Sequence, residues 1–288
     1  MEHDMKFGIT GATGQLGRIV LEKLKEKTSS DNIAALVRSP EKAAELHVEA
    51  REFDYNKPEN LVAALKGIET LLIISGNEIG KRATQHNNII EAAQKTGVKH
   101  IVYTSLLRAD SSTLILAGEH LATENAIKNS GIPYTILRNG WYTENYTSSL
   151  KGVLAGGILP GSCGDGKISS ASRADFAEAA VVVLTTDGHE NKTYELAGDE
   201  AYTMSDFAAE LSRNAGKNIP YKNLPVGEYI DILVKSGMPE GYAQFISGTH
   251  VSTEKGDLFD DTHQLSKLIG HPTTSLSKSI ADALAGLL

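Results

Sequence analysis

The sequence predicts a doubly wound α/β protein with a parallel sheet and a smaller, mainly helical C-terminal domain. Short apolar runs alternate with amphipathic stretches over the first half of the chain, which is typical of parallel strands joined by crossover helices. Two of these runs, TLLIIS and HIVYTS, lack an alternating polar pattern, as expected for strands that are buried on both faces. After about residue 145 the rhythm changes, and the last stretch, about 220–288, is expected to be mainly helical.

The expected strands and helices follow one another regularly. Strands are predicted at residues 6–10, 32–38, 50–55, 70–76, 99–106 and 134–140. Helices are predicted at residues 16–27, 58–67 and 85–97, and another is expected to begin near the stretch LAGEH, residues 116–120. Residues 148–172 are rich in Gly and Ser and are expected to be irregular. Residues 173–186 and 203–216 are expected to form helices on either side of a strand at 192–198, with Thr203 and Asp206 spaced as a capping box.

These elements predict two domains, which a chain of 288 residues is long enough to form. Residues 1–150 are expected to form the sheet domain. Residues 151–288 are expected to form the smaller domain, with 173–200 returning to the sheet. We expect the smaller domain to pack against the sheet domain and to leave a substrate cleft between them.

Composition and charge exclude several classes of protein. The chain is 41% hydrophobic and 22% charged, as in ordinary soluble globular proteins. Its formal net charge of −8 argues against a nucleic-acid or membrane-surface binder. No stretch approaches the roughly 20 apolar residues of a membrane span, and no signal peptide is visible, so a cytoplasmic protein is expected. Cys163, the only cysteine, lies in a Gly-rich loop that suggests an exposed thiol, and the scattered histidines predict no metal site.

A glycine-rich turn is the first functional motif. GITGATGQLGRIVLEKL places Gly11, Gly14 and Gly17 after a strand and at the start of a helix. Such a turn lets backbone N–H groups approach a pyrophosphate, whose charge the helix dipole favours. The spacing is GxxGxxG, and its strand–turn–helix context predicts a Rossmann-type dinucleotide site that also includes Thr13, Gln15 and Leu16. The alternative is an ordinary tight turn between a strand and a helix.

The residues after the next strands suggest which dinucleotide binds. Arg38 ends the second strand, where an NAD-binding protein would carry an acidic residue for the ribose. A guanidinium there can pair with a 2′-phosphate, so the sequence predicts NADPH, although a solvated arginine is the alternative. Asp54 follows the third strand and can contact the adenine or stabilise its own turn. Ser75, Gly76 and Asn77 end the fourth strand, at the carboxyl edge where ligands bind in such sheets.

Five stretches carry a resemblance to a known family. They are TGATGQLG, YTSLL, LRNGWYTENY, GDGKISSASRAD and LSKLIGHPTT. Together they resemble the NmrA-like branch of the atypical short-chain dehydrogenases, and in particular the bacterial NADPH:quinone oxidoreductases of type 2 and the related triphenylmethane dye reductases. The resemblance covers essentially the whole chain.

The resemblance also shows what the chain lacks. Many short-chain dehydrogenases use a Tyr-x-x-x-Lys pair as proton donor, and in register with LAGEH those places hold Leu116 and His120. Ser105 remains near the family's serine place and is expected to lie at the cofactor. Reduction of a simple carbonyl benefits from a general acid, whereas a quinone or a cationic dye needs none from the protein. His120 is either a helix residue of the core or a ligand contact.

The stretch after the sixth strand is expected to line the nicotinamide end of the cofactor. The resemblance implies this role for Asn139, Gly140, Trp141, Tyr142, Thr143 and Glu144. An amide such as Asn139 can bond the carboxamide, because it both donates and accepts. Tyr142, with Trp141 and Tyr146, offers a flat face for stacking, and packing between domains is the alternative. Asn139 and Tyr142 are therefore expected to position the reactants.

These inferences predict an NADPH-dependent oxidoreductase that passes hydride directly to quinones or similar planar acceptors. One alternative is an NmrA-like NADP(H)-binding redox sensor without turnover, and the other is a reductase of dyes or xenobiotics. The expected partner is a small planar acceptor, with no nucleic acid and no membrane span, and the protein is expected to be a monomer or a homodimer.

Overall fold

A computed structural model describes residues 7–287, and its centre is a sheet of seven strands. The strand order is β3-β2-β1-β4-β5-β6-β8, and the first six strands along the chain pair in parallel. Because the order reverses between β1 and β4, the sheet is doubly wound, which confirms the predicted fold class. The strands are β1 (Phe7–Thr10), β2 (Ile33–Val37), β3 (Glu49–Glu52), β4 (Thr70–Ile73), β5 (His100–Leu106), β6 (Tyr134–Asn139) and β8 (Lys192–Leu196).

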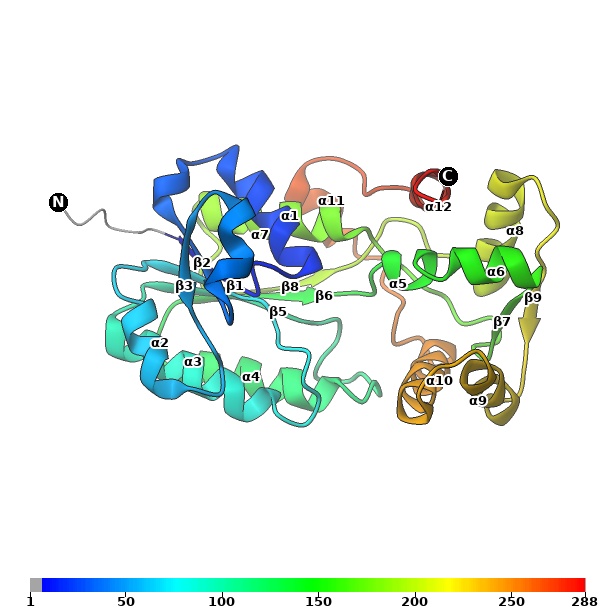
Figure 1. The fold of residues 1–288 in the computed structure, drawn as a ribbon, viewed down its shortest axis with the longest axis horizontal. Helices are drawn as coiled ribbons and strands as arrows, with labels where there is room; N and C mark the ends of the chain where they lie inside the picture. The colour runs from blue at the N-terminus through cyan, green and yellow to red at the C-terminus, as the bar shows by residue number, and fades with distance from the viewer. Residues whose placement is uncertain (1–6, 288) are drawn as a thin grey trace. The chain divides into compact units, whose positions relative to one another are not determined.

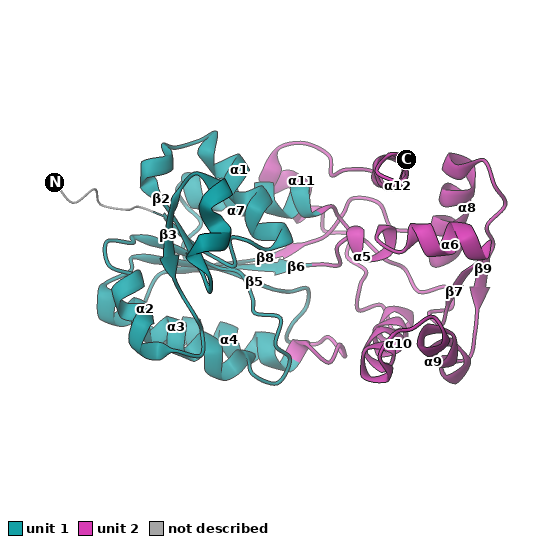
Figure 2. Cartoon of the chain, in the orientation of Figure 1, with its two compact units in different colours: residues 1–110, 118–139, 173–194 teal, residues 111–117, 140–172, 195–288 magenta. Residues whose placement is uncertain are grey.

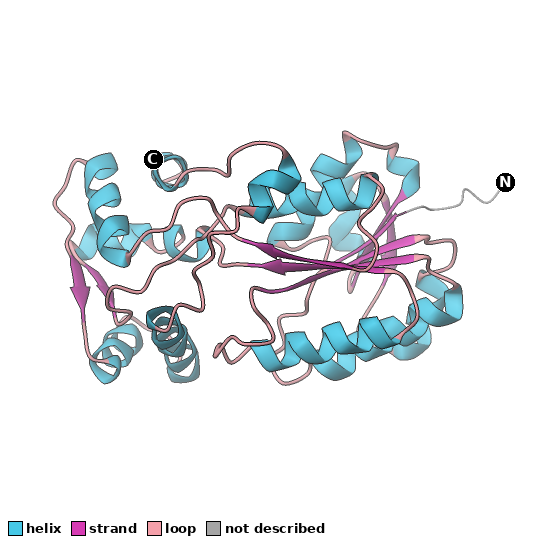
Figure 3. Cartoon of the chain, turned by 180° about the vertical axis from the view of Figure 1, so that it is seen from behind, coloured by secondary structure: helices cyan, strands magenta, loops and turns pink. Residues whose placement is uncertain are grey.

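Helices cover both faces of this sheet, as Figures 1 and 3 show. One face carries α1 and α7, which pack together, and the other carries α2, α3 and α4. These helices are α1 (Gln15–Lys25), α2 (Pro58–Ala64), α3 (Arg82–Thr96), α4 (Ala117–Asn129) and α7 (Arg173–Thr185), with short 3-10 helices at Ser30–Asn32 and Pro40–Leu46. Strands β1 and β2 are buried along their whole length, which explains apolar runs without alternation.

The chain forms two compact units, which Figure 2 colours separately. Unit 1 comprises residues 1–110, 118–139 and 173–194, and unit 2 comprises residues 111–117, 140–172 and 195–288. Unit 1 therefore holds strands β1 to β6 complete, and unit 2 resumes at the residue that follows β6.

Unit 2 is mainly helical, as predicted. Its helices are α5 (Glu144–Thr147), α6 (Leu150–Gly156), α8 (Met204–Ala215), α9 (Val226–Lys235), α10 (Glu240–Glu254), α11 (Gln264–Ile269) and α12 (Leu276–Ala285). Two short strands, β7 (Leu159–Gly161) and β9 (Tyr221–Asn223), pair in parallel. The predicted capping box is present at α8, because the Thr203 hydroxyl accepts from the Asp206 N–H while the Asp206 carboxylate accepts from the Thr203 N–H.

The expectation that residues 148–172 are irregular is wrong in part. Helix α6 forms there because Leu150 and Val153, one turn apart, are both buried. Strand β7 forms because it pairs with β9, a partner far along the chain that no local pattern reveals. The thiol of Cys163 is buried and not exposed, since its sulfur lies 3.4 Å from the hydroxyl of Tyr221 on β9.

Three further features bear on function. Within residues 7–287, every helix is too short or too polar to span a bilayer. The same part of the chain has no group of three His, Cys, Asp or Glu side chains placed to hold a metal ion.

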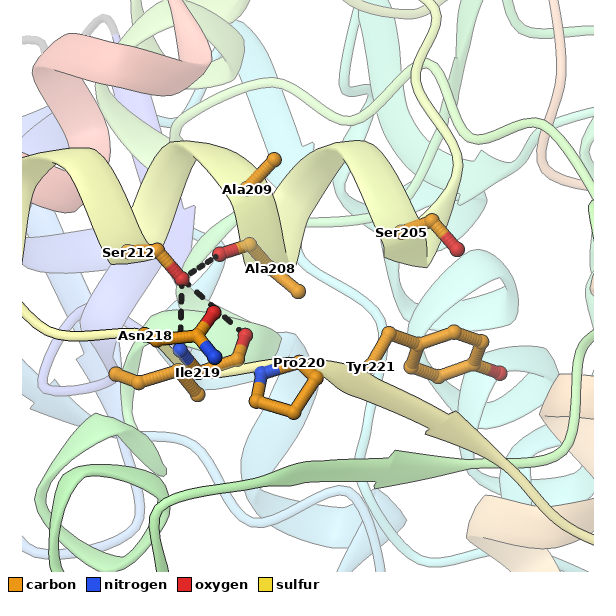
Figure 4. A pocket seen from close by; sticks show the side chains of 8 residues that line it. All are labelled: Ser205, Ala208, Ala209, Ser212, Asn218, Ile219, Pro220 and Tyr221. Atoms are coloured by element: carbon orange, nitrogen blue, oxygen red, sulfur yellow. Dashed lines mark hydrogen bonds between the residues drawn. The ribbon is translucent and has the colours of Figure 1, made fainter.

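An open pocket of about 400 Å³ lies in unit 2, between α8 and the residues that lead into β9 (Figure 4). The Ser212 hydroxyl at this pocket donates to the Ala208 carbonyl and accepts from the Ile219 N–H, so it serves the fold.

Candidate active site

The glycine turn between β1 and α1 has the geometry that phosphate binding requires. Gly11 adopts a φ of +60°, which glycine tolerates best, and its carbonyl accepts from the Gly14 N–H at 2.9 Å. A Cβ on Gly17 would lie 2.3 Å from that same carbonyl oxygen, so only glycine permits this packing. Among the described residues no side chain caps α1 at Gly14, and its first turn has no acidic residue. The first N–H groups of α1 are therefore available to an anion.

The side chains beside this turn have different surroundings. Thr13 is half-buried, and its carbonyl accepts a hydrogen bond from Nε of Arg18 at 3.0 Å. Gln15 is exposed, whereas Leu16 is buried in the core. Leu16 can therefore meet a ligand only through its backbone.

Arg38 follows β2 with an exposed side chain. A hydrogen bond from Lys81 and, more weakly, the nearby charge of Arg38 lower the pKa of Glu78. The Arg38 side chain makes no hydrogen bond or ion pair within residues 7–287, so its guanidinium is available to a phosphate. Asp54 serves its own turn, because its Oδ1 accepts from the Asn56 N–H at 3.0 Å. This is one of the two roles that the sequence left open for Asp54.

Ser75, Gly76 and Asn77 follow β4 at the carboxyl edge of the sheet. The Ser75 N–H donates to Oγ1 of Thr104 at 3.0 Å, and the Gly76 N–H donates to Nε2 of His86 at 3.0 Å. Both N–H groups are therefore used within the protein. The Ser75 hydroxyl, the exposed Asn77 side chain and the surface of Gly76 are left for a ligand.

Ser105 faces a buried ion pair. Its Oγ donates to Oε1 of Glu124 at 2.6 Å. Arg138 donates to both carboxylate oxygens of Glu124, at 2.9 and 2.8 Å, and to Asp110 at 3.1 Å. The hydrogen bond from Arg138 also lowers the pKa of Asp110. The Glu124 carboxylate on α4 therefore connects the end of β5 to the end of β6, directly before Asn139.

His120 stands at the family's lysine place and is locked in the core. Its Nδ1 lies 2.8 Å from the Tyr103 hydroxyl, and burial lowers the pKa of His120 to about 3. Burial raises the pKa of Tyr103 as well. Leu116, at the position of the family's tyrosine, is half-buried, and its side chain has no proton that it could donate to a substrate. Of the two roles left open for His120, the structure supports the one in the core.

Asn139 ends β6 with a buried side chain that lacks partners. Only 3% of the residue is exposed, and neither Nδ2 nor Oδ1 has a hydrogen-bond partner among the described residues. Its backbone is in contrast satisfied, because the Asn139 carbonyl accepts from the Leu107 N–H at 3.0 Å. An unpaired buried amide costs stability, and a ligand amide that donates and accepts would satisfy it.

The segment after Asn139 is held by the backbone of unit 2. The Gly140 N–H donates to the Leu196 carbonyl at 2.7 Å, and a Cβ on Gly140 would lie 3.0 Å from that oxygen. The Thr143 N–H donates to the Ala171 carbonyl at 2.9 Å, and its hydroxyl lies 2.7 Å from Oγ of Ser170. Residues 140–144 therefore form a fixed platform.

Three side chains of this platform keep partly exposed surface, namely Trp141, Tyr142 and Glu144. Tyr146, in α5, packs its ring at 5.8 Å from that of Phe207. Burial raises the pKa of Tyr146 well above its ordinary value. Tyr146 is therefore a packing residue within unit 2, whereas the alternative left open for these aromatics was packing between domains.

The structure brings the predicted residues of unit 1 to one edge of the sheet. Each lies at or just beyond the carboxyl end of a strand, and parallel strands end at the same edge. They are Gly11, Thr13, Gly14, Gln15, Leu16 and Gly17 after β1, Arg38 after β2, Asp54 after β3, Ser75, Gly76 and Asn77 after β4, Ser105 in β5 and Asn139 in β6. Residues 140–144 belong to unit 2.

Sequence reasoning missed the side chains that support this edge. They are Arg82, His86, Glu124 and Arg138. Only Arg138 carried a signal, because a charge inside the apolar run TILRN is expected to have a buried partner.

The glycine turn between β1 and α1 lies where the strand order reverses, and the unpaired amide of Asn139 lies at the same edge of the sheet. This arrangement is that of a dinucleotide-binding protein. Comparison with known proteins agrees. The NAD(P)H-binding family matches residues 11–187. Quinone oxidoreductase 2 of Escherichia coli (strain K12) is 50% identical over 96% of this chain and 97% of its own length.

Solved structures give the same result. An NADPH-dependent quinone oxidoreductase from Escherichia coli complexed with NADPH has a TM-score of 0.94 at 49% identity, covering 96% of this chain and 99% of its own. The triphenylmethane reductase of Citrobacter sp. complexed with NADP(H) has a TM-score of 0.93 at 38% identity, covering 96% of this chain and 100% of its own. The chain belongs to the NAD(P)H-binding, NmrA-like family of oxidoreductases that includes these two enzymes. The resemblance that the five stretches predicted is thereby confirmed.

Proposed function

We propose that the chain is an NADPH-dependent oxidoreductase that transfers hydride directly to quinones or similar planar acceptors. The observation that carries the proposal is the buried, unpartnered amide of Asn139 at the carboxyl end of β6. It lies in a chain whose glycine turn suits a pyrophosphate. Its relatives are, by their names, an NADPH-dependent quinone oxidoreductase and a triphenylmethane reductase complexed with NADP(H).

The residues fit this cofactor in a definite order. The turn from Gly11 to Gly17 would hold the pyrophosphate, and Arg38 the 2′-phosphate. Asp54 would lie at the adenine, and the edge from Ser75 to Asn77, with Ser105 behind it, would flank the cofactor. Asn139 would bond the nicotinamide carboxamide, and Gly140 to Glu144 would line the nicotinamide end.

The absence of a proton donor agrees with the proposed acceptors. When bound, NADPH supplies a hydride, and a quinone that accepts it becomes a hydroquinone after taking one proton from water. Neither Leu116 nor the buried, neutral His120 can act as general acid, so the chain contributes position instead. Asn139 would fix the nicotinamide, and Tyr142 would offer a flat face to the acceptor.

Reduction of cationic dyes is the second candidate. The likeness to the triphenylmethane reductase of Citrobacter sp. favours it, and the chemistry needs no proton at all. A redox-sensor role has weaker support, because the likeness to the transcriptional regulator NmrA is only 14% in sequence and shows the fold alone. We further propose that the protein is cytoplasmic, is a monomer or a homodimer, and binds a small planar acceptor but no nucleic acid.

The proposal is tested by following NADPH absorbance with a simple quinone, in the absence of flavin. We expect quinone-dependent oxidation that prefers NADPH to NADH. Asn139→Leu should lower kcat/KM by about ten- to a hundredfold, because one or two hydrogen bonds are lost. Asn87→Leu, an exposed position on α3, is the matched control. Tight NADPH binding without turnover of any quinone or dye would overturn the proposal.

A further inference from the structure

The loop between β4 and α3, residues 74–81, is held by side chains from other parts of unit 1. The Ile74 N–H donates to Oγ1 of Thr10, the last residue of β1, at 2.9 Å. The Ser75 N–H donates to Oγ1 of Thr104, in β5, at 3.0 Å. The start of the loop is therefore fastened to both neighbouring strands of the sheet.

Gly76 is fastened at both of its polar backbone groups. Its N–H donates to Nε2 of His86 at 3.0 Å, and its carbonyl accepts from Nε of Arg82 at 2.5 Å. Both side chains come from α3, and both residues are buried. A Cβ on Gly76 would lie 3.2 Å from Oε1 of Gln85, so the peptide also packs closely against α3. The N–H belongs to the Ser75–Gly76 peptide and the carbonyl to the Gly76–Asn77 peptide, so α3 holds the peptide units on both sides of Gly76.

The hydrogen bonds around His86 fix its tautomer. Because Nε2 accepts from Gly76, the ring proton is on Nδ1, which lies 2.9 Å from Oγ1 of Thr123. The Thr123 hydroxyl in turn donates to the Glu119 carbonyl at 3.0 Å. Burial, and to a lesser extent the charge of Arg82, lower the pKa of His86 to about 4, so the imidazole is neutral. Every donor therefore has an acceptor in this series of hydrogen bonds, which runs from the Gly76 N–H to the Glu119 carbonyl on α4.

The far end of the loop is fastened to the same helix α4. One carboxylate oxygen of Glu119 accepts from the Gly80 N–H at 2.9 Å and from the Arg82 N–H at 3.2 Å. The other lies 3.5 Å from Nη1 of Arg82. The loop therefore spans a short distance between two anchors, with Gly76 at one and Gly80 at the other.

We infer that His86 is a positioning residue for NADPH: its neutral imidazole holds the Gly76 peptide so that the edge after β4 keeps the shape the cofactor needs. The inference rests on the proposed function, which places the cofactor against Ser75, Gly76 and Asn77. Without an acceptor at His86, the Gly76 N–H loses its partner within the protein, and the Ser75–Gly76 peptide loses one of the contacts that orient it. The imidazole is fully buried, so we expect its loss to affect cofactor binding and not the chemical step.

The test compares His86→Leu with His86→Gln by calorimetric binding of NADPH and by steady-state kinetics with a quinone. The leucine removes the acceptor, and we expect the Kd and KM for NADPH to rise about tenfold. The glutamine restores an acceptor, and we expect the Kd within about threefold of the unchanged protein. The kcat at saturating NADPH should stay the same in both variants.

His100→Leu is the matched control. His100 is the first residue of β5, at the opposite edge of the sheet, and its Nε2 lies 2.9 Å from Oγ1 of Thr135. This variant loses a partly buried histidine and its side-chain hydrogen bond, far from the loop at residues 74–81, so it should lower the melting temperature without changing the Kd. If His86→Leu does not fold, Thr123→Val removes the partner that fixes the tautomer, and we expect the Kd to rise by about threefold.

Each result separates the inference from the proposed function. If His86→Leu binds NADPH as tightly as the unchanged protein, the histidine is only structural and the inference fails, while quinone turnover upholds the function. If binding weakens and is restored by glutamine but no acceptor is reduced, the inference stands and the function fails. An unchanged protein that binds no NADPH overturns both.

Discussion

Two side chains at the carboxyl edge of the sheet, Arg38 and Asn139, stand out because their polar groups are unused. Arg38 is exposed, with no hydrogen bond or ion pair in the described part of the chain, and Asn139 is buried with both amide groups unpaired. Buried polar groups in proteins are nearly always hydrogen-bonded, so the unpaired amide of Asn139 indicates a ligand. Ser105 and His120, two other candidates, already have partners within the fold.

Arg38→Ala tests the selection of cofactor. A charge-assisted bond to the 2′-phosphate is worth roughly 1.5–3 kcal/mol, so the Kd for NADPH should rise by about ten- to a hundredfold. The Kd for NADH, which lacks this phosphate, should change little. Calorimetry with both cofactors measures the difference, and an equal loss for the two would show that Arg38 does not select.

At the scale of secondary-structure elements, the Glu124 carboxylate connects α4, β5 and β6. Glu124 on α4 is fully buried and bonds Ser105 on β5 and Arg138 on β6. The ends of two neighbouring strands are thereby fixed to a helix beside Asn139. A buried ion pair adds little net stability, but removing one partner leaves the other charge buried.

Glu124→Gln should therefore destabilise the protein strongly. Arg138 would lose its buried counter-charge and keep its bond to the exposed Asp110, so we expect a loss of up to about 3–5 kcal/mol in the free energy of unfolding. Urea denaturation measures it, with Glu91→Gln as control, because Glu91 forms only an exposed pair with Lys95 at 3.9 Å. The control should lie within about 0.5 kcal/mol of the unchanged protein. Similar losses in both variants would contradict the role of Glu124.

Gly17→Ala tests the junction of β1 and α1. Its Cβ would lie 2.3 Å from the Gly11 carbonyl oxygen, so α1 must move and the turn that faces the pyrophosphate must change. We expect NADPH binding to be lost or weakened by more than about a hundredfold. Gly152→Ala, inside α6 with open space around it, should bind normally and gain up to about 1 kcal/mol of stability. Normal binding by Gly17→Ala would exclude the turn as the phosphate site.

At the scale of the whole molecule, the sequence predicted what repeats locally and missed what depends on distant partners. The parallel sheet was predictable because strands buried on both faces appear as apolar runs, and the glycine turn was predictable from its spacing. Strand β7 was missed because its partner β9 is remote in sequence. The supports of the edge, such as His86 under Gly76, were missed because they require the strand order and the helix positions.

The stability of the whole protein should depend on pH through its buried histidines. Burial lowers the pKa of His86 and His250 to about 4 and that of His120 to about 3. In the unfolded chain each histidine titrates near about 6.5. Between these values the unfolded state binds more protons, so the stabilisation is complete above about pH 6.5 and is lost as the pH falls toward 4.

Urea unfolding between about pH 7 and pH 5 measures this loss, because the carboxylates with lowered pKa values titrate at lower pH. Below about pH 6.5 we expect each of the three histidines to contribute up to about 1.4 kcal/mol per pH unit. His250→Gln should remove its own share of the slope. A free energy of unfolding that is independent of pH in this window would mean that the imidazoles are solvated.

In the proposed reaction, hydride passes directly from NADPH to a planar acceptor without a flavin. Deuterium transfer tests it most directly, with NADPH labelled at the reactive position of nicotinamide C4 and a cationic triphenylmethane dye as acceptor. The dye is informative because its central carbon keeps the label, whereas the hydrogen added to a quinone oxygen exchanges with water.

We predict that one of the two C4 epimers of labelled NADPH transfers its deuterium to the central carbon of the dye, as mass spectrometry of the reduced product would show. A reduced dye that carries only solvent hydrogen would mean that an exchanging carrier intervenes, and it would contradict direct transfer. Absence of any dye or quinone reduction by a protein that binds NADPH would contradict the assignment of an oxidoreductase altogether.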